Sequence, residues 1–246
     1  MSRFISTFRS SSAQLSIVLA VILATGCSQP TTLQEIREEG VLHVITRVAP
    51  SIYYQDREQD TGYDYELARL FANELGVELR VRVADDNSEI LSVLSRNYAH
   101  VGLAGLTQRP DFDNQYRSVP IGVSAQSVIV YHKEVPAPES LEDLASETIH
   151  MLADSNHEHR LNEARQENAE LEWQVHPGLD AAGVLSRVES GEFPYAMVSS
   201  NELDLNHVFY PMVKEAFTVG EPGELAWFFP SAQDDSLAKA APQFLE

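Results

Sequence analysis

The stretch TGYDYELARLFANELGVELRVRV, residues 61–83, decides the fold because it places an amphipathic helix directly before a strand. Apolar residues recur at helical spacing over 63–76, on one face that holds Leu67, Leu70, Phe71 and Leu75. Gly76 then supplies a typical helix C-cap. Residues 77–83 alternate strictly between apolar and polar, which predicts a strand with one solvated face.

The same order of strands and helices continues on both sides of this stretch. We predict strands at 41–46, 77–83, 101–105, 124–131, 148–152, 171–175, 195–198, 213–218 and 225–229. We predict helices at 33–40, 63–76, 156–168, 180–189 and 201–209, one capped by Asn87, and one starting at Asp234 or Asp235. Such alternation predicts an α/β fold with mostly parallel sheets flanked by helices. The break from Tyr131 to Pro138 predicts two such sheets of about 100 residues each.

Composition excludes several classes of function. The 246 residues carry 17 Lys and Arg against 37 Asp and Glu, a net charge of −20. Nucleic acid is therefore not expected as a partner, because phosphate binding needs clustered cations. A membrane with anionic lipids would also repel the chain, so membrane attachment needs an anchor. The single cysteine excludes an internal disulfide and any multi-Cys metal site.

Residues 1–26 have the pattern of a secretory signal peptide. They contain Arg3 and Arg9, no acidic residue, and an apolar run from Leu15 to Ala24. That run is too short to span a bilayer, which takes about 20 apolar residues. We therefore expect residues 1–26 to be removed from the mature protein.

The segment Leu23-Ala24-Thr25-Gly26-Cys27 resembles a bacterial lipobox, which ends in the acylated cysteine. The resemblance implies lipidation of Cys27, a tether over residues 27–32, and membrane attachment through the lipid only. Enteric lipoproteins retained at the inner membrane have Asp where this chain has Ser28. We therefore expect a periplasmic protein anchored to the outer membrane. The alternative is an ordinary cleaved signal peptide that ends near a cysteine.

Three segments in the first third of the chain together resemble the family 3 periplasmic solute-binding proteins. They are Gly40-Val41-Leu42-His43-Val44, Thr61 to Ala68, and Leu75-Gly76-Val77. The resemblance implies the two-lobe, type II periplasmic-binding-protein fold, in which crossover strands join two α/β lobes that close on a ligand. Lobe 1 would comprise 33–123 and 220–246, and lobe 2 would comprise 124–219.

Five further segments resemble the N-terminal module of the lytic murein transglycosylase F family. They are Val44 to Arg47, Ala104 to Thr107, Ser199 to Leu203, Leu225 to Trp227, and Asp234 to Leu237. That family joins a solute-binding-like regulatory module to a murein-cleaving domain, whose Glu-Ser catalytic motif has no counterpart in these 246 residues. We therefore expect a binding module without catalytic residues, which is a truncated copy, a fragment or a stand-alone sensor.

Candidate ligand-binding residues follow the strands of the predicted sheets. Ligands of open α/β sheets bind at the carboxyl ends of strands. The candidates are Tyr53, Tyr54, Asp64, Thr107, Arg109, Ser155, Asn156 and Ser199. Each has a structural alternative: a tyrosine can pack on its own lobe, Asp64 can favour its helix dipole, Arg109 can pair with Asp111 or Asp113, and Ser155 or Asn156 can cap a helix.

The resemblance also bears on the class of ligand. Amino-acid-binding members hold the α-carboxylate with an Arg and the ammonium with an Asp. Here Arg109 lies earlier in its loop than the family Arg, and the second position is Ser199. We therefore predict a cleft without the paired charges that a zwitterion needs, since each lost charged contact costs about 1.5–3 kcal/mol. A small polar, peptide-like ligand derived from murein is the expected partner.

No motif for a metal or a cofactor is expected to be functional. His157 and His159 lie two residues apart, so on a helix they point apart. No cofactor is predicted, and we expect a monomer. Three hypotheses stay open: a sensor that serves a murein-cleaving domain, a solute-binding protein that serves a permease, and a module that cleaves murein itself.

Overall fold

The structure is a computed structural model that describes residues 29–57, 59–109, 112, 114–166 and 170–245. The elements below all belong to one compact unit that begins at Thr32. The predicted signal peptide 1–26 and lipidation site Cys27 lie outside the described residues. None of the helices in the described ranges is long and apolar enough to cross a membrane.

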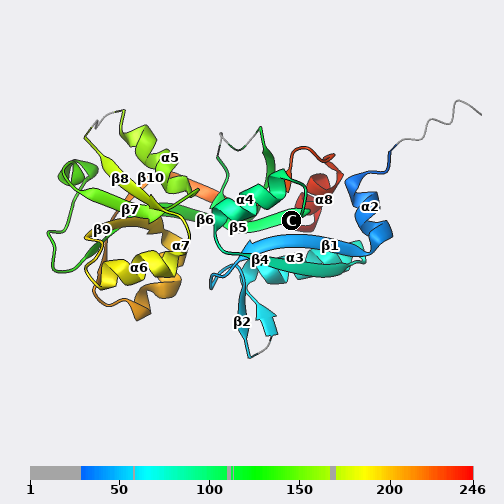
Figure 1. The fold of residues 1–246 in the computed structure, drawn as a ribbon, viewed down its shortest axis with the longest axis horizontal. Coiled ribbons are helices and arrows are strands. Elements are labelled where there is room, and N and C mark those ends of the chain that lie inside the picture. The colour runs from blue at the N-terminus through cyan, green and yellow to red at the C-terminus, as the bar shows by residue number, and fades with distance from the viewer. Residues whose placement is uncertain (1–28, 58, 110–111, 113, 167–169, 246) are drawn as a thin grey trace, which may run out of the picture. The chain divides into compact units, whose positions relative to one another are not determined.

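The helices and strands alternate along the chain (Figure 1). The first part holds α2 (Thr32–Glu39), β1 (Val41–Arg47), β2 (Tyr54–Asp56), β3 (Gln59–Thr61), α3 (Tyr63–Leu75), β4 (Glu78–Ala84), α4 (Asn87–Ser95), β5 (Val101–Thr107) and β6 (Tyr116–His132). The second part holds η2 (Leu141–Leu144), β7 (Thr148–Leu152), α5 (Asn156–Ala164), β8 (Glu172–His176), α6 (Ala181–Glu189), β9 (Tyr195–Ser199), α7 (Ser200–Asn206), η3 (His207–Phe209), β10 (Val213–Pro230) and α8 (Ser236–Leu245).

Two long antiparallel strands, β6 and β10, join the two lobes. The strand order β4-β1-β5-β10-β6-β9-β7-β8 forms one eight-stranded sheet. The second half of β10 pairs with β5 and with the first half of β6, whereas the first half of β10 pairs with the second half of β6. β1 is parallel to β4 and β5, and β7 is parallel to β8 and β9. The two predicted sheets are therefore fused through the crossing strands.

Helices cover both faces of the sheet in each lobe. In the first lobe α2, α3 and α8 pack on one face around Phe71 and Trp227, and α4 packs on the other face around Leu94. In the second lobe α6 and α7 cover one face, whereas α5 and η2 cover the other. The predicted fold class, a two-lobe α/β protein with mostly parallel strands flanked by helices, is confirmed. The residue bounds of the lobes stay a prediction.

Most elements were predicted near their observed bounds, and several details differ. β6 starts at Tyr116 rather than at residue 124, and residues 213–229 form one strand with register shifts rather than two strands. The helix expected over 156–168 ends at Ala164. The N-cap of α4 is Asp86, whose carboxylate accepts from Glu89 N at 2.9 Å, and not Asn87. The polar hairpin of β2 and β3 was not predicted.

One carboxylate ties the first helix of the first lobe to its last helix. Asp234 Oδ2 accepts hydrogen bonds from the backbone N–H of Thr32 at 2.5 Å and from its hydroxyl at 2.7 Å. Asp234 Oδ1 accepts from Ser236 N at 2.8 Å at the start of α8. These bonds hold the pKa of Asp234 well below its usual range.

We predict that Asp234→Ala lowers the free energy of unfolding by about 1–2 kcal/mol, the usual cost of losing a capping carboxylate. The loss should be present at neutral pH and shrink in acid, because a protonated Asp234 already lacks most of this stabilisation. Urea titrations of wild type and variant at several pH values measure the effect. Asp204→Ala, at an exposed position of α7, is the control and should change stability little. Equal effects of the two variants would contradict the prediction.

Candidate ligand-binding cleft

The carboxyl ends of strands from both lobes meet at a small central cavity. It encloses about 20 Å³, room for about one water molecule. Its lining residues are Arg47, Asn87, Gly105, Leu106, Thr107, Leu152, Ser155, Asn156, His157, Ser199 and Glu202. β1 ends at Arg47 and β5 ends at Thr107, while β7 ends at Leu152 and β9 ends at Ser199. This is the edge at which open α/β sheets bind ligands.

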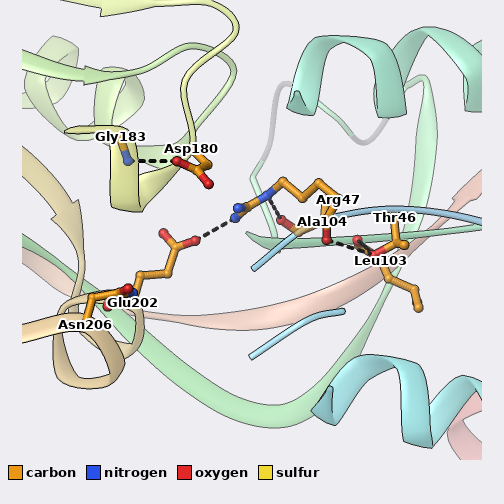
Figure 2. A network of polar contacts seen from close by, with 8 residues as sticks. All are labelled: Thr46, Arg47, Leu103, Ala104, Asp180, Gly183, Glu202 and Asn206. Atoms are coloured by element: carbon orange, nitrogen blue, oxygen red, sulfur yellow. Dashed lines mark hydrogen bonds and ion pairs between the residues drawn. The ribbon is translucent and has the colours of Figure 1, made fainter. Parts of the chain in front are cut away.

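A buried ion pair crosses the cavity from one lobe to the other. Arg47 Nη2 lies 2.7 Å from Glu202 Oε1, and both side chains are only 5% exposed. Figure 2 shows the two side chains pointing toward each other from β1 and α7. Arg47 is held by its Nε–H, which donates to Ala104 O at 3.1 Å. The cleft is closed at this point by a charge-assisted contact.

Three further contacts join the lobes around this ion pair. Arg109 Nη1 donates to Ser155 O at 2.7 Å, and its guanidinium lies 3.7 Å above the Phe112 ring. The hydroxyl of Ser88 donates to the carboxylate of Asp154. The carboxylate of Asp86 accepts from Gly178 N at 3.2 Å. The lobes are therefore in direct polar contact along the cleft.

Buried polar groups without partners concentrate in the cleft. Among the described residues, the buried side-chain atoms with no hydrogen-bond partner are Arg47 Nη1, Asn87 Oδ1, Thr107 Oγ1, Asn201 Oδ1 and Trp227 Nε1. The first three line the central cavity, and Asn201 lines a second cavity beside it. A buried polar group without a hydrogen-bond partner is energetically costly, so its presence in a native structure needs an explanation. A ligand that binds to it is one such explanation. Only the indole of Trp227 lies elsewhere, in the core of the first lobe.

The second cavity adjoins the central one at Gly105 and encloses about 270 Å³. Its lining residues are Ser51, Ile52, Tyr63, Asp64, Gly105, Ile121, Val123, Asn201 and Leu225. Asp64 is 4% exposed, and burial raises the pKa of its carboxyl to about 7, although the nearby Arg47 guanidinium lowers it. Asp64 therefore keeps its proton at pH values far above those at which a carboxyl usually loses it.

Five of the predicted site residues line one or the other cavity. Thr107, Ser155, Asn156 and Ser199 meet at the central cavity, and Asp64 lies at the second. Ser155 occupies the N-cap position of α5, but its hydroxyl donates to Leu152 O at 2.8 Å and makes no cap bond. Residues at strand ends and helix starts of both lobes therefore converge on the two cavities.

The other three predicted residues lie away from the central cavity. Tyr53 is buried in the first-lobe core, and its hydroxyl donates to Asp60 Oδ1 at 2.7 Å. Tyr54 lies on the exposed β2 strand. Arg109 lines a separate hollow together with Phe112 and Asp154, where it joins the lobes through Ser155 O.

Sequence reasoning missed Arg47, Asn87, His157, Asn201 and Glu202. The prediction of a cleft without paired charges is wrong, because Arg47 and Glu202 place one charge of each sign in it. Both positions follow from the strand-end argument: Arg47 is the last residue of β1, and Glu202 follows β9 by three residues. The sequence predicts Asn87 as a helix cap, but in the structure Asn87 lines the cavity.

His157 is fully enclosed and uncharged. Its Nδ1 lies 2.8 Å from Ser127 Oγ, and burial lowers its pKa to about 4. His159 Nε2 lies 3.4 Å from Glu163 Oε1 on the same helix. Within the part of the chain that the structure describes, no three His, Cys, Asp or Glu side chains gather as a metal ion would require.

The two α/β lobes, the crossing strands and the polar cleft between the lobes define the class as a type II periplasmic binding protein. The chain belongs to the bacterial extracellular solute-binding proteins, family 3, whose family model matches residues 41–244. Over its full 246 residues it is 85% identical to the membrane-bound lytic murein transglycosylase F of Marinobacter nauticus. It is 34% identical, over 254 aligned residues and 99% of the chain, to the protein of the same name from Hahella chejuensis.

The chain spans about half the length of these relatives, since each alignment covers 49% of the longer protein. The predicted resemblance to the solute-binding module of that protein family is confirmed. An ancestral arginine-binding protein bound to arginine matches with a TM-score of 0.72 at 19% identity, over 84% of this chain and 91% of that one. An ancestral amino acid-binding protein, a precursor of cyclohexadienyl dehydratase, matches with a TM-score of 0.73 at 21% identity, over 87% and 92%. These two likenesses establish the fold.

We predict that Glu202→Gln lowers the free energy of unfolding by about 3–5 kcal/mol, because it leaves the buried Arg47 guanidinium without a carboxylate. The double variant Arg47→Met, Glu202→Leu removes both charges and should recover much of this loss. Urea denaturation measures both. Glu66→Gln breaks an exposed pair with Arg69 and should cost under about 1 kcal/mol. Equal costs for the buried and exposed pairs would contradict the prediction.

We predict that Asp64→Asn stabilises the protein above pH 7 and has little effect near pH 4. The native carboxyl holds its proton up to about pH 7, whereas the unfolded one releases it near 3.8, so wild-type stability falls between these values. The pKa shift of Asp64 sets an upper bound of about 4 kcal/mol on the gain in the free energy of unfolding. Denaturation of variant and wild type is compared from pH 4 to pH 8. Both proteins contain His157, so the difference between their free energies of unfolding reports on Asp64 alone. The exposed Asp56→Asn is the control, and a gain that does not vary with pH would refute the assignment.

Proposed function

We propose that this module binds a small polar ligand between its lobes and closes around it. The observation that carries the proposal is the group of buried polar atoms without partners: Arg47 Nη1, Asn87 Oδ1 and Thr107 Oγ1 at the central cavity, with Asn201 Oδ1 beside it. A ligand that satisfies them recovers the desolvation cost of each group, about 1–3 kcal/mol.

Binding requires the lobes to open first. The central cavity holds about one water, so any larger ligand enters only after the Arg47–Glu202 contact and the Arg109–Ser155 contact separate. A ligand then favours a closed state in proportion to the contacts that it makes only there. This two-state closure is a known mode of hinged domains around ligands.

The chemistry of the cleft favours a ligand that carries several amide groups. The guanidinium offers a donor, the two asparagine amides offer donors and acceptors, and the Thr107 hydroxyl offers both. A peptide backbone presents the matching set of N–H and C=O groups. With the similarity to lytic murein transglycosylase F, we propose a peptide fragment of peptidoglycan as the ligand, sensed on behalf of a murein-cleaving domain.

The predicted location fits this role. We propose that the module faces the periplasm on a lipid anchor at Cys27, with the outer membrane favoured, where fragments of the murein layer are released. Peptidoglycan cleavage by this chain itself is the weakest of the three hypotheses, and clear lysis in a murein zymogram with the purified chain would revive it.

A second candidate is a solute-binding protein that delivers an amino acid to a permease. The observation that favours it is the pair Arg47 and Glu202, which could exchange their mutual contact for the carboxylate and the ammonium of a zwitterion. A free amino acid would then raise the melting temperature as strongly as a peptide fragment does.

We predict that murein-derived disaccharide peptides raise the melting temperature of the purified chain more than any free amino acid does, since a ligand of the native state stabilises it by mass action. Thr107→Val should weaken peptide binding about two- to tenfold, the loss of one neutral hydrogen bond. The same variant should not lower the melting temperature without ligand, because the hydroxyl has no partner there.

The exposed Thr218→Val is the matched control and should bind as wild type does. Thermal denaturation and calorimetric titration measure both properties. Stronger stabilisation by a free amino acid than by the fragments would favour the permease hypothesis. No stabilisation by either class would overturn the proposal.

A further inference from the structure

The second cavity has walls from both lobes and little polar surface. Ile52, Ile121, Val123 and Leu225 supply apolar side chains from the first lobe and the crossing strands. Asn201, in the first turn of α7, comes from the second lobe. With about 270 Å³ it has far more room than the central cavity, which holds about one water. A group seated here would touch both lobes, so its binding would favour closure.

Gly105 lines both cavities and has no room for a side chain. A Cβ atom at this position would lie 2.6 Å from Ile52 Cδ1 and 3.4 Å from Arg47 Nη2. The φ angle of Gly105 is +62°, which is also unfavourable for other residues. Because Gly105 lines both cavities, they adjoin at this residue, and a ligand bound beside Arg47 in the opened cleft would have the second cavity within reach.

The polar groups of the second cavity are suited to a ligand group without charge. The charged group that acts on Asp64 is the Arg47 guanidinium of β1, which is paired with the Glu202 carboxylate of α7. Tyr63 is the other titratable residue in the lining, and Ser51 and Asn201 are uncharged. Below pH 7 the Asp64 carboxyl is neutral, so the cavity as a whole carries no charge.

We propose that the second cavity is a specificity subsite that binds an uncharged, mainly apolar group of the ligand, with the Asn201 amide as its polar contact. This inference rests on the proposed function, since the subsite extends the same cleft. An anionic end group would be desolvated against apolar walls and, above pH 7, would face an ionised Asp64. A cationic end group would enter beside the guanidinium of Arg47.

The subsite also makes affinity depend on pH. An apolar group that fills the cavity lowers the polarity beside the Asp64 carboxyl, which lines it, and thereby favours its protonated form. Binding is then coupled to one proton, and affinity falls as pH rises through the pKa of about 7. Between pH 6 and pH 8 full coupling corresponds to a loss of about tenfold.

Three probes with one apolar side chain and different charges test the subsite: N-acetyl-leucine amide, N-acetyl-leucine and leucine amide. NMR titration of the purified chain at pH 6 should give the highest affinity for N-acetyl-leucine amide, which is uncharged. Its affinity should fall about tenfold at pH 8 in wild type, and Asp64→Asn should bind equally at both pH values.

Two matched substitutions locate the binding. Val123→Phe fills the second cavity and should weaken binding of the uncharged probe at least tenfold. Val208→Phe makes the same change at an exposed position, 67% accessible, and should leave binding unchanged. Circular dichroism of Val123→Phe establishes that it folds, and Leu225→Phe, which fills the same cavity from another wall, replaces it if it does not.

The outcomes separate this inference from the proposed function. Any of three results would overturn the proposal of a subsite. They are equal binding of the three probes, preference for a charged probe, and unaltered binding by the folded cavity-filling variant. If murein-derived disaccharide peptides still bind wild type in those cases, the proposed function stands without the subsite. If neither the uncharged probe nor the peptides bind wild type, both are overturned.

Discussion

The ion pair between Arg47 and Glu202 is the constraint on which the cleft depends. Each charge is almost fully withdrawn from water, and an isolated charge in such a place is far less stable than a paired one. The two residues belong to different lobes, so separating the lobes exposes both to solvent, where the loss of the contact is offset by hydration. The pair thus links the solvation of two side chains to the distance between two lobes. The unfavourable state is a partly open one, in which the two charges are separated but not yet hydrated. This favours two distinct conformations, closed and open, over a continuous range of lobe separations.

The crossing strands determine how the lobes can separate. The pairing of β6 with β10 shifts register between Val219 and Gly223 and again between Glu224 and Ala226, at the point where the strands pass from one lobe to the other. Gly220 has a φ angle of +71° in this segment. A bulge adds twist and leaves backbone groups unpaired, so the ladder is weakest there. Bending at this segment would move Glu202 away from Arg47 while the hydrophobic cores within each lobe stay packed, as at a hinge between rigid lobes.

The sequence predicted what depends on local pattern and missed what depends on distant contacts. The apolar face of α3 and the five residues of β7 follow from periodicity alone. The first residues of β6 do not, because their burial is irregular and is set by pairing with β10, about a hundred residues later. In the cleft, Thr107 is the last residue of the buried strand β5 and lines the central cavity, at the strand end where ligands were expected. Arg47 obeys the same rule, but its role depends on Glu202, and nothing local to either residue indicates the other.

The electrostatic balance inside the cleft differs from that of the chain as a whole. The sequence carries a net charge of −20, so the protein's long-range field repels anions and attracts cations. The central cavity, in contrast, is lined by one cation and one anion in contact with each other and by His157, which is neutral because its pKa is lowered to about 4. The second cavity holds Asp64 in its protonated form below pH 7. The charges that line the two cavities are therefore paired or, for Asp64 below pH 7, protonated, while the side chains of Asn87, Thr107 and Asn201 keep hydrogen-bonding atoms without a partner.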